Sequence, residues 1–232
     1  MQRCLITGAN RGLGLAFTRQ LLMRGARVLA CCRDLDQAVD LRKLREEHSD
    51  HLVLHALDVT DSAAIAVLPK AAEKHLQGID LLINNAGVLV SGERFGNIEA
   101  QSLARSFAVN ATAPLLITQA LEALLMRGNN PRVLCISSQL GSIAQASSFQ
   151  TPSYAMSKAA LNMGVKRLAA ELGPRGIVVL ACHPGWMKTT MGGKNAMLAP
   201  DESAKALLDL IANARIADGG KFLSYDGAEL PW

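Results

Sequence analysis

The chain lacks any hydrophobic run long enough to cross a bilayer. A membrane-spanning helix needs roughly 20 consecutive apolar residues. Half of the 232 residues are hydrophobic, but polar residues interrupt every apolar stretch before that length is reached. The chain also enters a strand-like run at once, at MQRCLITGAN, which leaves no room for an export signal. We therefore expect a soluble, cytoplasmic protein with no membrane partner.

Aromatic residues and clustered positive charge are also scarce. Aromatic residues make up 4% of the chain, and the 24 Lys and Arg residues behind the formal net charge of +4 are scattered. A nucleic-acid surface usually gathers basic residues on one face. The composition therefore predicts no nucleic-acid partner and favours a small anionic ligand.

Cysteine spacing typical of metal sites is absent. The five cysteines are Cys4, Cys31, Cys32, Cys135 and Cys182, and they fall in or at the ends of apolar strand-like runs. An odd number in such positions is typical of reduced core residues. We expect no metal site.

What the chain does contain is a regular alternation of short apolar runs with longer amphipathic stretches. This alternation is typical of βα units around a parallel sheet that is buried on both faces. We expect strands at 3–7, 28–32, 52–57, 79–83, 132–136, 177–182 and 221–225. Helices are expected at 15–24, after the second strand to about 47, from an N-cap at Asp61 to about 77, and at 98–126 with a kink at Pro114. Two more are expected, one from the segment around Tyr154 to about 172 and one at 201–214. The predicted fold class is α/β, a single-domain, Rossmann-like, doubly wound parallel sheet of about seven strands with helices on both faces.

A glycine-rich turn joins the first predicted strand to the first helix. Gly8, Gly12 and Gly14 allow a tight turn, close approach of a pyrophosphate and close packing of helix on sheet. The spacing differs from the usual dinucleotide fingerprint, and a glycine turn without a ligand is the alternative. The turn is therefore a candidate phosphate site.

Tyr154 and Lys158 stand four residues apart in a helical stretch, so their side chains project from the same face. A free phenol has a pKa of about 10, and a neighbouring ammonium would lower that pKa by roughly two units. The pair predicts a tyrosine that transfers protons near neutral pH. Taken alone, it is also what an ordinary surface helix contains.

Several further motifs appear in a fixed order along the chain. They are Asn84-Asn85-Ala86-Gly87 after the fourth strand, Ser137-Ser138 before Tyr154, and His183-Pro184-Gly185 after the sixth strand. With the glycine turn and the Tyr154 helix, they make nearly the whole chain similar to the short-chain dehydrogenase/reductase family. NRGLG, YAMSKAALNM, HPGWMKT and the terminal YDG with PW most resemble the family's small carbonyl reductases of the sniffer and C-factor type.

The resemblance implies a catalytic tetrad of Asn110, Ser138, Tyr154 and Lys158. Ser138 is preferred to Ser137 as the second position of the family's SSxxG, where its hydroxyl would hold the substrate's carbonyl oxygen. Lys158 would also bind the nicotinamide ribose. Asn110 would hold its helix open to a water that relays protons to Lys158. The alternatives are a serine that only bonds the strand end and an asparagine that only bridges backbone groups.

The resemblance also implies a set of cofactor contacts. They are Gly8, Asn10, Arg11, Gly12, Leu13, Gly14, Arg33, Asp58, Val59, Asn85, Ala86, Gly87, Tyr154, Lys158, Pro184, Gly185, Met187 and Thr189. The acidic residue that would select NAD at the end of the second strand is replaced by Cys32. Arg11 and Arg33 would instead bind a 2'-phosphate. We expect NADP(H) to be preferred, and NAD(H) to be possible because Asp34 would weaken that preference. Asp58 alternatively caps the turn that follows it.

The predicted substrate pocket contains Ser138, Gln139 and Trp186, with the irregular segment 183–200 as a candidate lid. Trp186 either walls the pocket or packs within that lid. The dinucleotide-binding part is expected at about 1–135 and the catalytic and substrate-binding part at about 136–232, within one domain.

These expectations lead to an NADP(H)-dependent carbonyl reductase, or an alcohol dehydrogenase in reverse, that acts on a small-molecule carbonyl or alcohol. The rival is a dinucleotide-binding signalling or regulatory protein of the C-factor type with weak activity. A weaker option is epimerase or dehydratase chemistry, which the small C-terminal region disfavours. The family suggests a homodimer or homotetramer. Small and apolar residues after Lys158, including Ala159 and Met163, fit such an interface, but core packing explains them equally.

Overall fold

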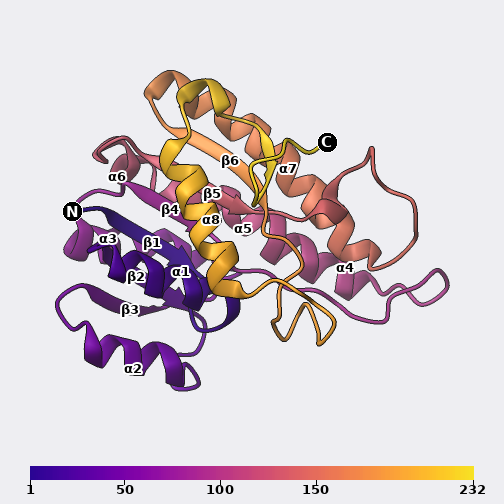
Figure 1. Cartoon of the computed structure of the whole chain (residues 1–232), viewed down its shortest axis with the longest axis horizontal. Helices are drawn as coiled ribbons and strands as arrows, with labels where there is room; N and C mark the ends of the chain where they lie inside the picture. The colour runs from indigo at the N-terminus through magenta and orange to yellow at the C-terminus, as the bar shows by residue number, and fades with distance from the viewer.

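A computed structural model describes residues 1–232, and a seven-stranded parallel sheet runs through its centre (Figure 1). The strands are β1 (Arg3–Thr7), β2 (Arg27–Cys32), β3 (Leu52–Ala56), β4 (Leu81–Asn84), β5 (Arg132–Ile136), β6 (Val178–His183) and β7 (Phe222–Ser224). Their order is β3-β2-β1-β4-β5-β6-β7. The order reverses beside β1, and ligands of such sheets bind beyond the carboxyl ends of the strands at this point. The predicted Rossmann-like fold class is confirmed.

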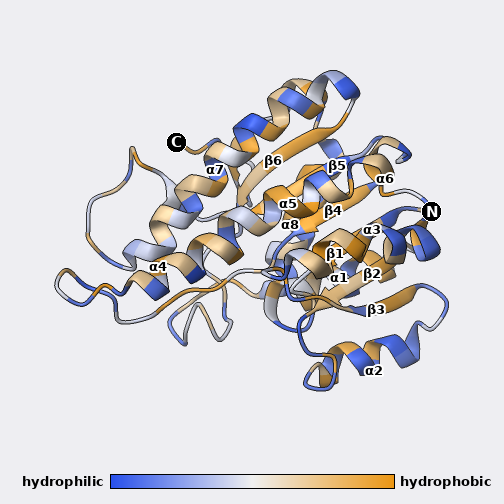
Figure 2. Ribbon diagram, turned by 180° about the vertical axis from the view of Figure 1, so that it is seen from behind, coloured by the Kyte–Doolittle hydropathy of each residue, from blue (hydrophilic) through white to orange (hydrophobic).

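Helices cover both faces of the sheet. One face carries α1 (Gly12–Met23), α2 (Val39–Glu47) and α8 (Pro200–Asn213), and α1 and α8 lie in front of the sheet in Figure 1. The other carries α3 (Ser62–Leu76), α5 (Ala113–Ala120), α6 (Glu122–Met126) and α7 (Pro152–Leu172), with α5 and α7 in front in Figure 2. Side chains alternate along each strand, so Ile6 packs in one core cluster and Leu5 in the other. Both faces of the sheet are therefore buried.

The helical region predicted over 98–126, with a kink at Pro114, is confirmed, but it is divided more than once. The chain forms α4 (Ala100–Phe107), a π-helical turn η1 (Ala108–Thr112), α5 and then α6. Pro114 has no N–H, and its ring excludes the carbonyl four residues earlier, that of Asn110. The Ala113 N–H instead bonds to the carbonyl of Ala108, five residues back. The predicted break at Pro114 is thus a wider helical turn centred on Asn110, while the second break, at Leu121, was not predicted.

Smaller differences fall at the ends of elements. The fourth strand begins at Leu81 rather than Ile79, because the Ile79 N–H bonds to Leu124 instead of a neighbouring strand. Asp61 caps α3 as predicted, and its Oδ1 accepts bonds from the N–H groups of Ala63 and Ala64 at 2.8 and 3.2 Å. Three short 3₁₀ turns were not predicted, namely η2 (Gln139–Gly141), η3 (Gly173–Arg175) and η4 (Ile216–Asp218).

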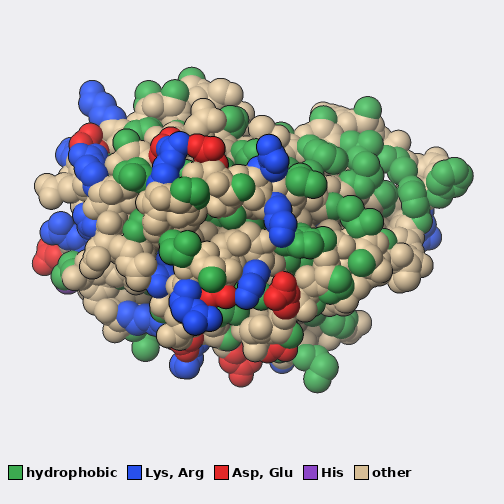
Figure 3. Space-filling view, turned by 90° about the horizontal axis from the view of Figure 1, so that it is seen from above, with side chains coloured by type: hydrophobic (Ala, Val, Ile, Leu, Met, Phe, Trp, Pro, Cys, Tyr) green, Lys and Arg blue, Asp and Glu red, His purple; other side chains and the backbone are tan.

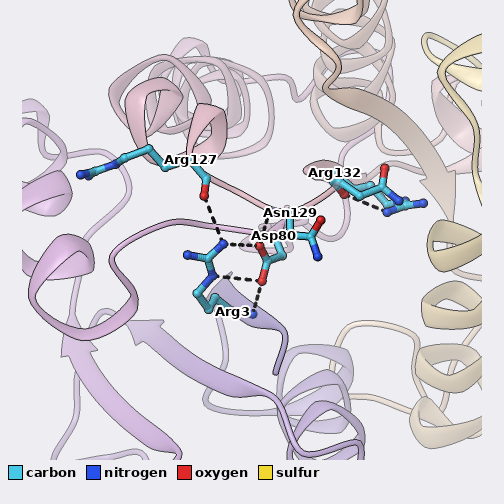
Figure 4. Close-up of polar contacts among 6 residues, drawn as sticks. Arg3, Asp80, Arg127, Asn129 and Arg132 are labelled. Carbon is cyan, nitrogen blue, oxygen red and sulfur yellow. Dashed lines mark hydrogen bonds and ion pairs between the residues drawn. The ribbon is translucent and has the colours of Figure 1, made fainter.

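An ion pair fastens the two central strands at their amino ends (Figure 4). Asp80 is 5% exposed, and its Oδ1 lies 2.6 Å from Nη2 of Arg3. The other oxygen accepts the Arg3 backbone N–H at 2.7 Å, and the N–H of Asn129 bonds to Oδ1 at 2.6 Å. Arg3 reaches the Arg127 carbonyl as well, at 3.2 Å. This cluster lies at the edge of the sheet opposite the carboxyl ends of the strands.

No helix in the structure has both the length and the apolar character that a membrane crossing requires.

Candidate active site

The glycine turn lies at the carboxyl end of β1 and is packed too tightly for other residues. Gly8 has a φ of +66°, and a Cβ there would lie 2.8 Å from the Cα of Ala86. At Gly14 a Cβ would lie 2.1 Å from the Gly8 carbonyl oxygen. The bare backbone of the turn therefore leads directly into the N-terminus of α1, where orphan N–H groups favour an anion.

Asn85 fastens the segment after β4 to this turn. Its Nδ2 donates to the carbonyls of Thr7 and Gly8 at 2.9 and 3.0 Å. In return, the Thr7 hydroxyl accepts the N–H groups of Asn85 and Ala86, both at 3.1 Å. The Asn85 side chain is therefore committed to holding the turn.

Gly87 links the turn to the predicted tetrad. A Cβ at Gly87 would lie 3.4 Å from Oδ1 of Asn110 and 3.9 Å from Nζ of Lys158. The glycine turn and the tetrad are thus two ends of one site along the carboxyl edge of β1, β4 and β5.

Tyr154 is nearly buried in the first turn of α7, with 8% of its surface exposed. Burial raises the pKa of the Tyr154 phenol, and the hydrogen bond with the side chain of Ser138 only partly offsets this rise. The predicted lowering of the phenol pKa by Lys158 is therefore wrong. The ammonium lies 5.6 Å from the centre of the Tyr154 ring, so its charge does not outweigh burial of the phenol.

The Lys158 side chain is directed at the sheet. Its Nζ donates a 2.6 Å hydrogen bond to the carbonyl of Ile136, the last residue of β5. Burial lowers the pKa of Lys158 to about 8, although the neighbouring Cys135 thiol acts in the opposite direction. Lys158 therefore remains largely an ammonium at neutral pH.

Asn110 lies fully buried in the π-helical turn and bridges backbone groups. Its Oδ1 accepts the Val88 N–H at 2.8 Å, and its Nδ2 donates to the Val88 carbonyl at 2.8 Å. Nδ2 also donates to the Ser157 hydroxyl at 2.9 Å. The backbone-bridging alternative is therefore present in the structure, and a water relay from Asn110 to Lys158 stays a prediction.

The two adjacent serines after β5 have different surroundings. The Ser137 hydroxyl donates to Oδ1 of Asn162 at 2.6 Å, and Asn162 bonds to the Gly141 carbonyl at 3.2 Å. The Ser138 hydroxyl accepts the Leu140 N–H at 3.2 Å and also hydrogen-bonds with the Tyr154 phenol. This difference supports the choice of Ser138 over Ser137 as the residue that contacts substrate.

The end of β2 has the features predicted for the adenosine side of the site. Cys32 is 3% exposed and uncharged there, and the Asp34 carboxylate is held by the N–H groups of Asp36 and Gln37. Arg33 is exposed, and so is Arg11 at the N-cap of α1. Neither arginine is in an ion pair. Both guanidiniums are therefore available to an anion.

Asp58 adopts the alternative capping role. Its Oδ1 accepts the Thr60 hydroxyl at 2.7 Å and the Thr60 N–H at 2.9 Å. These bonds from Thr60, with a smaller contribution from the charge of Arg33, lower the pKa of the Asp58 carboxyl. Asp58 thus orders the turn after β3, and Val59 beside it is half-buried.

The segment after β6 closes on itself and reaches the glycine turn. Met187 pairs with Leu198, and the indole N–H of Trp186 donates to the Gly192 carbonyl at 2.7 Å. Thr189 lies against Gly12, with 3.3 Å between its Cγ2 and a Cβ placed there. Trp186 is 58% exposed. The predicted contact at Thr189 therefore lies beside the glycine turn, and Trp186 is anchored within its own loop.

Exposed apolar side chains gather beyond the carboxyl edge. Figure 3 shows hydrophobic side chains collected over the right-hand part of the molecule, which carries α4 in Figure 1. Phe95 and Phe149 meet edge to face there, with 5.6 Å between ring centres, and Ile143 is 76% exposed. Gln139 is also exposed near this region, on η2. Loops 88–99 and 141–151 thus form an apolar rim, and loop 88–99 was not among the segments predicted to line the pocket.

Several buried polar residues that support Tyr154 were also missed. Glu93, Ser106 and Ser153 are buried and hydrogen-bonded to one another, and Ser157 bonds to the Tyr154 carbonyl at 2.7 Å. The available signal was the pair of serines four residues apart in the Tyr154 helix, because a helix places such residues on one face.

The chain is similar in sequence to a known family and to known proteins. The model of the family described as short chain dehydrogenase matches residues 2–197. The protein named C-signal from Myxococcus xanthus is 39% identical over 154 residues, which cover 66% of this chain and 93% of the relative.

Solved structures match the whole chain. NADPH-bound carbonyl reductase from chicken fatty liver has a TM-score of 0.94 and 34% identity, with 100% of this chain and 99% of that one covered. Carbonyl reductase Sniffer of D. melanogaster has a TM-score of 0.95 and 31% identity, with both chains fully covered.

Proposed function

The chain belongs to the short-chain dehydrogenase family, and we propose that it is an NADP(H)-dependent reductase of aldehydes or ketones. The observation that supports this most is the position of Tyr154. Its phenol is buried beside Ser138, and the buried Lys158 four residues later brings its Nζ close to the bare backbone of Gly87. A proton donor is thereby fixed at the carboxyl edge of the sheet, and structural relatives named carbonyl reductases share this fold over the full chain.

The residues of the turn fit a dinucleotide. The space at Gly8 and Gly14 admits no Cβ, and the orphan N–H groups of α1 begin there. We assign the pyrophosphate to this turn and to Asn10 and Leu13, with Lys158 at the nicotinamide ribose. A bound nicotinamide cofactor supplies the hydride for the carbonyl carbon.

Side chains of the protein protonate the carbonyl oxygen of the substrate and donate hydrogen bonds to it. Because burial raises the pKa of Tyr154, its phenol is protonated at neutral pH and acts as the acid. The Ser138 hydroxyl donates a hydrogen bond to the same oxygen and stabilises the alkoxide that develops there. Lys158 stays charged and donates toward the site as well as to Ile136. At neutral pH Tyr154 is therefore in the protonation state that carbonyl reduction requires.

The preference for NADP(H) rests on charge at the adenosine end. Arg11 and Arg33 are exposed and outside any ion pair, and Cys32 replaces the acidic residue that would repel a 2'-phosphate. The chicken carbonyl reductase structure contains NADPH. We assign the 2'-phosphate to these two arginines and the nicotinamide end to Pro184, Gly185 and Thr189 of the segment after β6, together with Met187.

A signalling function is the second candidate, because one relative carries the name C-signal. A protein that only senses a dinucleotide needs no proton donor, so the intact set of Ser138, Tyr154, Lys158 and Asn110 favours the enzyme. We also propose that residues 1–232 act as one domain that assembles as a homodimer or homotetramer, which analytical ultracentrifugation tests.

The decisive experiment is a panel of aldehydes, ketones and quinones offered to the purified protein with NADPH or NADH. A carbonyl reductase oxidises NADPH in the presence of at least one of them, with NADH less effective. Binding of NADPH without oxidation across the panel would favour the signalling protein instead.

A further inference from the structure

A buried glutamate outside the tetrad holds the first turn of the Tyr154 helix. Glu93 lies in the loop after β4 and is 7% exposed. Its Oε2 accepts the Ser153 hydroxyl at 2.6 Å and the Ser153 backbone N–H at 3.2 Å. Ser153 directly precedes Tyr154. We propose that Glu93 is a positioning residue that sets the place of the Tyr154 phenol, an inference that rests on the proposed reductase function.

The helix needs an external cap at this end. Thr151 is the N-cap residue of α7, but its φ is 45° and its side chain makes no capping bond. Pro152 follows and has no N–H, so the N–H of Ser153 is the first donor of the helix that requires a partner. Glu93 supplies that partner from 60 residues earlier in the chain. A carboxylate here also interacts favourably with the helix dipole.

A second contact, one turn further along α7, holds Tyr154 from the other side. Asn110 donates to the Ser157 hydroxyl at 2.9 Å, and that hydroxyl donates to the Tyr154 carbonyl at 2.7 Å. Asn110 is in turn bonded twice to Val88, in the same loop that carries Glu93. We call this series of hydrogen bonds, from Val88 through Asn110 and Ser157 to Tyr154, the inner bridge.

A second series of hydrogen bonds, the outer bridge, joins Ser106, Ser153 and Glu93 in the same way. The Ser106 hydroxyl donates to the Ser153 oxygen at 3.2 Å, and the Ser153 hydroxyl donates to Glu93. Ser106 lies one helical turn before Asn110, as Ser153 lies one turn before Ser157. Tyr154 thus stands between two parallel bridges that both end on the loop after β4. Losing the outer bridge removes the restraint on the N-terminal side of Tyr154 and leaves the inner one intact.

Stability alone does not account for this carboxylate. Its second oxygen, Oε1, is buried without a hydrogen-bond partner. An unpaired buried polar atom costs folding free energy. The Glu93 carboxylate offsets this cost by acting as a fixed hydrogen-bond acceptor at the N-terminus of α7. In that position it holds the proton donor Tyr154, which directly follows Ser153, in place.

The test compares Glu93→Ala and Glu93→Gln with the matched control Glu99→Gln. Glu99 lies in the same loop and is exposed, and its side chain makes no capping bond to α4. For each variant, kcat and KM are measured on the best carbonyl of the panel, NADPH affinity by fluorescence titration, and amide hydrogen exchange over 152–157 by mass spectrometry.

We expect Glu93→Ala to lower kcat by about tenfold, because small misplacements of reacting groups reduce rates strongly. NADPH affinity should change by less than about twofold, since the glycine turn and Lys158 are untouched. Exchange over 152–157 should rise while the rest of α7 stays protected. Glu93→Gln should keep most of the wild-type kcat, because its amide oxygen still accepts from Ser153, and the control should match wild type.

Two results would overturn the inference. One is a kcat for Glu93→Ala within twofold of wild type, and the other is an equal loss of kcat and NADPH affinity, which marks a general structural defect. If Glu93→Ala does not fold, Ser153→Ala replaces it. That variant loses the two hydroxyl bonds of Ser153, to Glu93 and from Ser106, but keeps the backbone N–H bond to Glu93, and an unchanged kcat again rejects the role. If wild type reduces no carbonyl, the proposed function fails, while the exchange measurement still decides whether Glu93 holds the helix.

Discussion

Lys158 donates a 2.6 Å hydrogen bond to the carbonyl of Ile136 at the end of β5. This bond ties the Tyr154 helix to the strand that leads into Ser138, so Lys158 positions two parts of the site. It also buries an ammonium, whose pKa falls to about 8. Burial of the Lys158 ammonium in the site therefore lowers the folding stability of the protein.

Replacing Lys158 by Met should abolish carbonyl reduction but raise the free energy of unfolding at neutral pH. The unfolded chain has a lysine pKa of about 10.4, so between about pH 8 and pH 10.4 it binds more protons than the folded protein. Wild-type stability consequently rises with pH across that window, and a penalty of roughly 3 kcal/mol applies in full below pH 8. The lost bond from the ammonium to Ile136 costs about 2 kcal/mol, which leaves a net gain of about 1 kcal/mol at pH 7.

Thermal unfolding of wild type and Lys158→Met at pH 7 and pH 10 checks this prediction. The gain in Tm should shrink at pH 10, and carbonyl reduction should be lost at both values. A pH-independent difference in Tm would show that burial of the ammonium is not the cause.

Changing Tyr154 to Phe should lower kcat by about a hundredfold or more, the usual contribution of a positioned acid. NADPH affinity should stay within about twofold of wild type, because the glycine turn and Lys158 are unchanged. Tyr225→Phe removes the only other tyrosine hydroxyl and serves as the control. Steady-state kinetics and fluorescence titration measure both quantities. Retention of full activity by Tyr154→Phe would remove the assigned acid.

Neutral replacements of Arg11 and Arg33 should weaken NADPH far more than NADH. A hydrogen bond to a charged group contributes about 1.5 kcal/mol or more, so each change should cost about tenfold in NADPH affinity. Arg42→Ala, on the exposed side of α2, is the control. Dissociation constants for both cofactors test the assignment, and equal losses for NADPH and NADH would show that the 2'-phosphate is bound elsewhere.

Asp80→Asn should destabilise the fold without altering the site. Burial alone would raise the pKa of Asp80, but hydrogen bonds from the Arg3 side chain and from the N–H groups of Asn129 and Arg3 hold it below its ordinary value. Its stabilisation is thus present above about pH 4 and is lost as the pH falls through the folded pKa. Breaking this largely buried pair should cost about 3 kcal/mol at pH 7.

Urea unfolding at pH 7 and pH 3 measures this effect, with exposed Asp50→Asn as the control. The difference between wild type and Asp80→Asn should narrow at pH 3, because the stabilisation from the Asp80 carboxylate is progressively lost below about pH 4. Activity at 25 °C should persist, since Asp80 directly precedes β4 at the amino ends of the strands, whereas the site lies at their carboxyl ends.

The features that the sequence determined are local ones. Alternating apolar runs specify strands that are buried on both faces, and the spacing of Gly8, Gly12 and Gly14 fits one strand-to-helix turn. The interval of four residues between Tyr154 and Lys158 puts both on one helical face. Pro114 likewise predicted the break near Asn110, because a proline affects the carbonyl four residues before it.

Only the tertiary structure decided how these groups interact. The pKa of Tyr154 is raised rather than lowered, because burial depends on every segment packed around the phenol. Lys158 bonds to Ile136, 22 residues away, and Glu93 caps a helix 60 residues further on. Such partners come from distant parts of the chain, so no spacing pattern encodes them. The sequence thus placed the reactive residues, and packing set their protonation and orientation.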